Sequence, residues 1–184
     1  MKELSLNILD IAMNSVKAGS TLIKIDIREN QTELVILITD NGCGMTREFL
    51  ESVTDPFCTT RTTRKVGLGI PFFKLMAEQT GGCLKIDSRS ELEFPDSHGT
   101  KTEAHFNKTH IDCLPLGDVA SSIVTLIQGS PTIDFEFTHV FEDAFQISLK
   151  TADLREVLGD VSLDTPEVVL WIKGYLEEQY KKAL

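Results

Sequence analysis

Three polar side chains near the N-terminus have the types and the spacing to handle a magnesium phosphate. Asp10, Asn14 and Lys17 lie within a segment of helical periodicity from about Lys2 to Ala18, so they fall along one face of the predicted helix. An amide oxygen suits Mg²⁺, which prefers hard oxygen ligands, and an ammonium group neutralises phosphate charge. The carboxylate, one helical turn away, could orient or deprotonate an attacking water. The alternative is a solvated polar face on an amphipathic helix.

A second candidate group is the stretch Asp40-Asn41-Gly42-Cys43-Gly44, which follows an apolar, β-branched run from Leu34 to Thr39. The run predicts a buried strand that ends at Asp40. A carboxylate there is costly unless a donor meets it, and a ligand amino group would supply a charge-assisted hydrogen bond. Gly42 and Gly44 remove side chains beside the carboxylate, which lets the backbone turn sharply and lets a flat ring approach closely. The alternative is a tight loop in which Asp40 caps its own backbone.

Two further stretches have a composition that suits phosphate. The segment from Thr54 to Lys65 is rich in hydroxyl and basic residues without apolar periodicity, so it is either a mobile lid or a surface loop. Gly67-Leu68-Gly69 then opens an apolar helix expected from about Ile70 to Gln79. Glycines directly before a helix leave backbone N–H groups pointing outward at the positive end of the helix dipole. Such a turn is typical of an anion site, although many turns of this kind bind nothing.

The elements that must position these groups are strands and helices in alternation. Thr21 to Glu29 alternates in polarity, and a polar turn joins it to the strand before Asp40, which predicts an antiparallel hairpin. Strands are also expected at 83–88 and 100–106. Beyond residue 107 we expect a helix at 118–128, a hairpin around 133–149, a short helix capped by Thr151 and a terminal helix that reaches Lys182.

Composition narrows the function classes. The chain has 184 residues, 41% of them hydrophobic, and a formal net charge of −10. This acidity argues against sequence-independent binding to nucleic acid or to an anionic membrane, since both need surplus Lys and Arg. No apolar run has the length of a signal peptide or of a membrane span, and we therefore expect a cytoplasmic protein.

Taken together, the four stretches resemble the nucleotide-binding domain of the GHKL superfamily, in both order and spacing. This superfamily includes gyrase B, the large heat-shock chaperone, sensor histidine kinases and MutL. The resemblance covers roughly residues 4–107. It implies the Bergerat fold, an α/β architecture of the α+β two-layer sandwich type in which helices cover one face of a mixed β-sheet. It also implies binding of ATP with Mg²⁺.

The resemblance assigns roles at the phosphate end of such a site. Asn14 matches the magnesium ligand, Asp10 the position of the general base, and Lys17 the phosphate-contacting lysine of histidine kinases. Asp is one methylene shorter than the Glu of hydrolysing members. The second glycine box, which contacts phosphates beside the lid, is matched by Gly67, Leu68 and Gly69.

At the adenine end, Asp40 with Gly42 and Gly44 resembles the first glycine box, in which the aspartate takes the adenine amino group. Thr100 matches a threonine that lies near adenine. Residues 55–60, including Phe57, Thr59 and Thr60, resemble the F box of histidine kinases, which is also part of the ATP site.

Departures from the family pattern shape the expected function. The first predicted helix begins almost at Met1, so we expect no helical hairpin with a phosphoacceptor histidine before it. We also expect no room for the second domain through which MutL and gyrase act on DNA. We expect an ATP-binding domain at 1–108 and a small α+β extension at 109–184.

Two functions remain. The first is a regulatory ATPase or kinase that passes phosphate to a partner protein, as anti-sigma serine kinases or two-component proteins do. The second is a non-catalytic, nucleotide-dependent switch. Expected partners are ATP or ADP and an unidentified protein, without nucleic acid or membrane, and a homodimer is one possible assembly.

Overall fold

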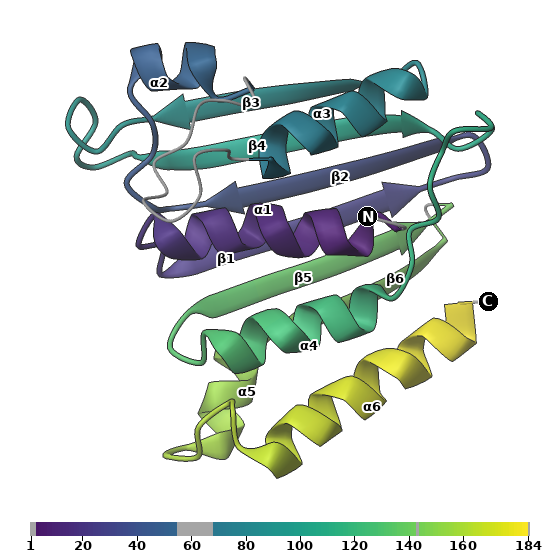
Figure 1. Cartoon of the computed structure of the whole chain (residues 1–184). Coiled ribbons are helices and arrows are strands. Elements are labelled where there is room, and N and C mark those ends of the chain that lie inside the picture. Colours follow the sequence, from purple (N-terminus) through teal and green to yellow (C-terminus); the bar gives the residue numbers. More distant parts are fainter. Residues whose placement is uncertain (1–2, 55–67, 143, 184) are drawn as a thin grey trace.

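One mixed sheet contains every strand that the structure describes. The computed structural model describes residues 3–54, 68–142 and 144–183 (Figure 1). The sheet has six strands in the order β3-β4-β2-β1-β5-β6, and helices lie over one of its faces (Figure 1). The predicted two-layer α+β architecture is therefore confirmed. The strands are β1 (Leu22–Glu29), β2 (Glu33–Asp40), β3 (Cys83–Arg89), β4 (Gly99–Asn107), β5 (Asp134–Phe141) and β6 (Phe145–Lys150).

The first half of the sheet is built from antiparallel neighbours. The predicted hairpin is confirmed, because β1 pairs with β2 in an antiparallel register. On its other side β2 pairs with β4, and this register sets Asp40 opposite Thr100. Two residues that are far apart in the sequence therefore meet at the end of β2. Among the described strands, the outer strand β3 pairs only with β4.

The second half of the sheet comes from the C-terminal part of the chain. β5 and β6 form the expected antiparallel hairpin, and β5 joins β1 in parallel, with Leu22 opposite Asp134. The chain beyond residue 108 thus extends the sheet begun by the first half. The division of the chain at this residue stays a prediction.

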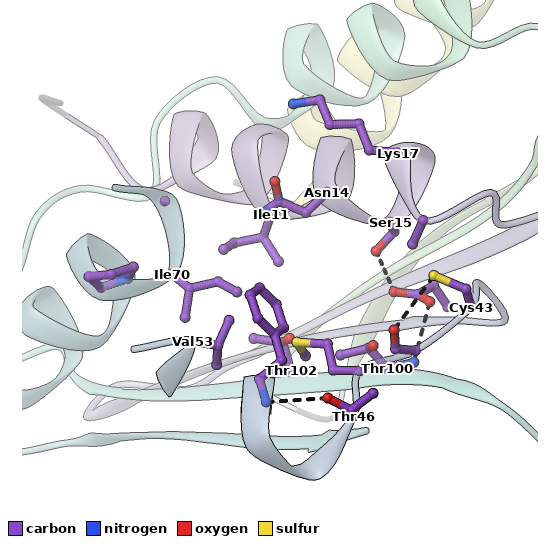
Figure 2. A pocket seen from close by; sticks show the side chains of 17 residues that line it. Ile11, Asn14, Ser15, Lys17, Cys43, Thr46, Val53, Ile70, Thr100 and Thr102 are labelled. Carbon is purple, nitrogen blue, oxygen red and sulfur yellow. Dashed lines mark hydrogen bonds between the residues drawn. The ribbon is translucent and has the colours of Figure 1, made fainter. Parts of the chain in front are cut away.

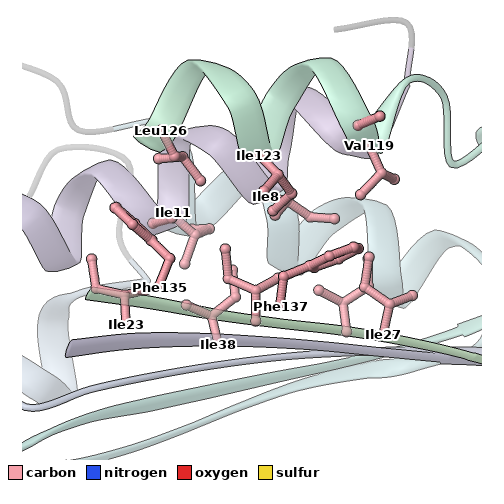
Figure 3. Packing of buried hydrophobic residues seen from close by; sticks show 14 of the residues in the cluster. Ile8, Ile11, Ile23, Ile27, Ile38, Val119, Ile123, Leu126, Phe135 and Phe137 are labelled. Atoms are coloured by element: carbon pink, nitrogen blue, oxygen red, sulfur yellow. The ribbon is translucent and has the colours of Figure 1, made fainter. Parts of the chain in front are cut away.

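Helices α1 (Ser5–Lys17), α3 (Gly69–Gln79) and α4 (Val119–Gly129) lie over the sheet. In Figure 3, Ile8 of α1 and Ile123 of α4 point toward Phe135 and Phe137 of the strand below. All four side chains are buried. Each buried side chain of this size contributes roughly 1.5–3 kcal/mol through loss of apolar contact with water, so this layer is what fixes α1 on the sheet.

The remaining helices are α2 (Arg47–Ser52), α5 (Thr151–Leu158) and α6 (Pro166–Ala183). The prediction that Thr151 caps α5 is wrong. Lys150 stands at the cap position, and the Thr151 hydroxyl instead accepts a hydrogen bond from the backbone N–H of Phe135 at 2.8 Å. Among the described residues no helix has the length and apolar character needed to cross a bilayer.

A polar cluster at the far end of β1 attaches α6 to the sheet. His139 of β5 is fully buried and places one ring nitrogen 2.9 Å from the Tyr180 hydroxyl of α6 and the other 3.1 Å from Glu29. Lys108 also pairs with Glu29. The hydrogen bond with His139, helped by Lys108 and opposed by burial, lowers the pKa of Glu29 to about 2. A carboxylate, an imidazole and a phenol thus join three segments.

Candidate functional site

A cavity of about 430 Å³ opens between α1, the N-terminal end of α3 and the ends of β2 and β4. In Figure 2, Asn14, Ser15 and Lys17 come from one helix, while Thr100 and Thr102 come from the strand opposite. The residues that line the cavity are Ile11, Asn14, Ser15, Lys17, Ala18, Asp40, Cys43, Gly44, Met45, Thr46, Phe49, Val53, Gly69, Ile70, Pro71, Thr100 and Thr102. Its walls are mostly apolar, with a few convergent polar groups, as ligand sites usually are.

Asp40 is the carboxylate of this cavity, and three donors orient it. The Ser15 hydroxyl donates to Oδ2 at 2.5 Å. The backbone N–H groups of Gly42 and Thr100 donate to Oδ1 at 2.9 and 3.3 Å. The bond from Gly42 is the local cap that the sequence also suggested, but the other two donors come from α1 and β4. The carboxylate is therefore held in one orientation by three separate segments.

The two glycines beside Asp40 are required by close backbone packing. Gly44 has φ +65°, and a Cβ built there would lie 1.9 Å from the Arg89 carbonyl oxygen. A Cβ on Gly42 would lie 2.7 Å from the Cβ of Ala18. The sequence suggested that these glycines allow a sharp backbone turn and the approach of a ligand ring. Their close contacts with Ala18 and Arg89 account for the first of these and bring the loop against α1 and β3.

The predicted polar residues of α1 fall in two places. Asn14 and Lys17 line the cavity, whereas Asp10 is not among its lining residues. Asp10 lies against the first residue of α3, since a Cβ on Gly69 would be 2.3 Å from Asp10 Oδ2 and 3.8 Å from Asn14 Nδ2. The N-terminus of α3, with its outward N–H groups and positive dipole end, therefore stands beside these two side chains.

Several predicted site residues lie outside the described part of the chain, namely Phe57, Thr59, Thr60 and Gly67. Leu68 is described and half-exposed, directly before α3. Of the predicted residues, the structure brings Asn14, Lys17, Asp40, Gly44, Gly69 and Thr100 to the cavity, while Gly42 lies against the lining residue Ala18 and Asp10 against the lining residue Gly69.

Sequence reasoning missed three residues that support this site. Ser15 orients Asp40, as described. Ser88 of β3 accepts a hydrogen bond from the Met45 N–H at 2.9 Å and shares another of 2.9 Å with the Thr100 hydroxyl. His98 places Nδ1 2.6 Å from the Gly42 carbonyl oxygen. The only available signal was Ser15, a hydroxyl on the apolar stripe of a helix. Ser88 and His98 have no distinctive spacing.

Comparison with known families gives a match to the first part of the chain. The model of the family described as "Histidine kinase-, DNA gyrase B-, and HSP90-like ATPase" matches residues 1–110. That range contains every residue that lines the cavity and more than half of the chain.

Among curated proteins, the chain is similar to the sensor protein SrrB of Staphylococcus aureus. The two are 35% identical over 97 residues, which is 50% of this chain and 16% of the relative. The chain therefore spans about a sixth of the length of the curated relatives it matches. Among solved structures, it is similar to the N-terminal domain of a DNA repair protein, at 14% identity and a TM-score of 0.56, covering 82% of this chain and 53% of that one. That likeness concerns the fold alone.

Proposed function

The chain belongs to the histidine kinase-, DNA gyrase B- and HSP90-like ATPase family, and from this premise we propose that it binds Mg-ATP in the cavity beside α1. We further propose that it uses the γ-phosphoryl group, either by hydrolysis or by transfer to a partner protein. The protein would then be a regulatory ATPase or kinase that acts in the cytoplasm.

The observation that carries this proposal is the fixed carboxylate of Asp40 inside an apolar cavity. Ser15 and the N–H groups of Gly42 and Thr100 occupy part of its hydrogen-bonding capacity. An ionised carboxylate has about four lone-pair sites, so it can accept one bond more. The exocyclic amino group of adenine is a donor of the right kind, and Ile11, Val53 and Ile70 supply apolar surface for a ring.

The opposite end of the cavity suits phosphate and a divalent cation. Asn14 presents a neutral amide oxygen, the hard ligand that Mg²⁺ accepts when phosphate oxygens and waters complete its shell. Lys17 adds a positive charge on the same side of α1, and the start of α3 at Gly69 offers backbone N–H groups. The donor set therefore fits a nucleotide whose base lies at Asp40 and whose phosphates lie between α1 and α3.

In the catalytic form of the proposal, bound Mg-ATP supplies the phosphoryl group and Asp10 acts as the base. Asp10 lies against Gly69 at the N-terminus of α3, one helical turn from Asn14. From there its carboxylate can accept the proton of a water or of a partner's hydroxyl. The acceptor belongs to a partner protein of the kind that anti-sigma kinases or two-component proteins modify.

One observation favours a second function, a nucleotide-dependent switch without turnover. Asp10 is not among the residues that line the cavity, although it lies against the lining residue Gly69. In that case ATP and ADP would stabilise different states of the chain, and the difference would govern binding of a partner.

Calorimetric titration tests the binding step directly. ATP, ADP and a non-hydrolysable ATP analogue are titrated with and without Mg²⁺, and the same samples are then analysed for ADP. Saturable binding that depends on Mg²⁺, with ADP accumulating over time, is the expected result. Binding without ADP formation supports the switch. Absence of binding would overturn the proposal as a whole.

Asp10→Asn separates the two functions. The expected result is loss of ADP formation with ATP affinity changed less than about threefold, because Asp10 is not among the residues that line the cavity. Glu78→Gln is the matched control, because it also replaces a carboxylate by an amide but lies on the exposed side of α3. It should leave turnover unchanged. Full turnover in Asp10→Asn would exclude Asp10 as the base.

A further inference from the structure

The two edges of the sheet differ in whether another element packs against them. At one edge, α6 packs on β6, and the Tyr175 hydroxyl donates to the backbone carbonyl of Ser148 at 3.2 Å. At the other edge, the backbone of β3 makes hydrogen bonds only to β4 among the described residues. Figure 1 shows β3 as the outermost strand on the side of the molecule opposite α6.

The free edge of β3 lacks three of the usual protections against strand pairing. Edge strands are commonly blocked by proline, by a bulge, by a very short length or by charged side chains, and of these β3 has only the charges. β3 runs for seven residues (Cys83–Arg89), contains no proline, and keeps an unbroken register with β4. Such an edge is a template for another strand.

The charges on β3 are unpaired and lie two residues apart. Lys85 and Asp87 are both exposed, and no described residue forms an ion pair with either. Their neighbours on β4, Glu103 and Lys101, already form an ion pair with each other at 3.0 Å. Side chains at alternate positions of a strand lie on the same face, and Leu84 and Ile86, which alternate with the two charges, are less exposed.

We propose that two copies of this chain pair through β3, antiparallel and centred on Ile86, so that one sheet runs through both copies. In this register Lys85 of each copy lies directly opposite Asp87 of the other, which makes two equivalent cross-strand ion pairs. In a two-fold interface both copies use the same surface patch, so the patch must be complementary to itself. Opposite charges in directly opposed positions stabilise a strand pair, and like charges destabilise it.

Charge complementarity selects a second copy as the occupant. The chain as a whole carries a net charge of −10, which disfavours association through most of its surface. Lys85, Asp87 and Arg89 make β3 slightly basic instead. In this register Ser88 lies opposite Leu84 of the other copy, and its side-chain hydroxyl accepts a hydrogen bond from the Met45 N–H of the loop before α2.

This interface uses no residue that lines the cavity, so it stands independently of the proposed function. An interface made of one strand from each copy is small, and small interfaces give weak, transient association. We therefore expect a monomer–dimer equilibrium that depends on protein concentration.

Sedimentation velocity over a concentration series, with reductant present, tests the pairing. The expected result for the unaltered chain is a shift from monomer to dimer as concentration rises. Lys85→Glu and Asp87→Lys each place like charges opposite one another in a homodimer, and each should weaken self-association by at least about tenfold. Arg28→Glu and Asp153→Lys change exposed charges elsewhere and should leave it unchanged.

The two single variants provide the decisive comparison. Mixed together, Lys85→Glu and Asp87→Lys present opposite charges to each other and should form a heterodimer. The double variant, with both charges exchanged, should regain self-association. Hydrogen exchange at the β3 amides should slow as the dimer forms. A chain that stays monomeric, or a dimer that these variants do not affect, would overturn the proposal.

Discussion

Asp40 shows how one side chain can depend on several segments. Its carboxylate receives hydrogen bonds from Ser15 in α1, from Gly42 in the loop that follows β2, and from Thr100 in β4. A group held in this way pays little orientational entropy when a ligand binds. Under the proposed function, this arrangement would hold a nucleotide base at this point of the cavity in one orientation.

Replacing Asp40 by Asn should weaken ATP binding by about 1–3 kcal/mol, because the amide is a poorer acceptor for an amino group than the carboxylate is. This corresponds to a loss of roughly 5-fold to 150-fold in affinity. Calorimetric titration with ATP measures the change. Asp26→Asn, the same substitution on the neighbouring strand β1, is the matched control. Unaltered affinity in Asp40→Asn would remove Asp40 from the base-binding role.

Gly44→Ala should destabilise the fold by about 2–4 kcal/mol, since a left-handed backbone and a clash with the Arg89 carbonyl act together. Urea unfolding measures the free energy of unfolding of the variant. Gly174→Ala is the control, because its Cβ meets nothing within 4 Å and the site lies inside α6. That control should be neutral or slightly stabilising. Equal effects in both variants would contradict the packing explanation.

For single residues, the sequence predicted the side chains that line the cavity but not the side chains that hold them in place. Asp40 and Asn14 could be found because glycines and helical spacing surround them. Ser88 and His98 could not be found, because their contacts with Thr100 and Gly42 depend on the register of β4 and the course of the loop before it.

Among the elements, β1 and α6 are joined by a buried polar contact. With hydrogen on Nε2, His139 donates to Glu29 and accepts from the Tyr180 hydroxyl. Burial raises the pKa of that hydroxyl, so Tyr180 stays protonated and remains a donor. The contact ties the last helix to the end of β1 opposite the cavity.

Stability should fall in acid through Glu29. The pKa of Glu29 is about 2 in the folded chain and 4.5 without these contacts. A depressed pKa stabilises the fold above the unfolded value, and the contribution is lost as the pH falls from about 4.5 to about 2. We expect a loss of roughly 2 kcal/mol over this range after allowance for partial exposure. Urea unfolding at several pH values measures it.

Glu29→Gln is the control for this pH dependence. The variant should be less stable than the unaltered chain at neutral pH and should show a flatter dependence between pH 4.5 and 2. If both proteins lose stability in parallel across that range, other carboxylates are responsible.

Most elements could be predicted from local pattern, because alternation and helical periodicity are local properties. The β1–β2 and β5–β6 hairpins are examples. The parallel pairing of β1 with β5 could not be predicted, since it joins residues about 110 positions apart. Thr151 was misjudged for the same reason, because its hydroxyl bonds to β5 rather than to its own helix.

For the whole molecule, the important fact is that the sheet crosses the predicted division of the chain. β5 fills one side of β1, and α4 packs beside α1. A family resemblance limited to the first 107 residues could not show this, because the partners of β1 and α1 lie beyond it.

A chain that ends at Lys108 should therefore fold poorly. β1 would become an open edge, and the apolar side of α1 that α4 covers would be exposed. Thermal unfolding followed by circular dichroism should show a transition that is much less cooperative than that of the full chain, or none. Cooperative melting within a few degrees of the full chain would show instead that residues 1–108 form an independent domain.

The parallel pair also has a consequence for biosynthesis. A ribosome adds about 5–20 residues per second, so β1 leaves the exit tunnel roughly 5–20 s before its partner β5 leaves it. Throughout that interval Ile23, Ile25 and Ile27 belong to a strand with one unpaired edge. Slower translation or a shortage of chaperones should therefore lower the yield of correctly folded chain, even when the finished protein is stable.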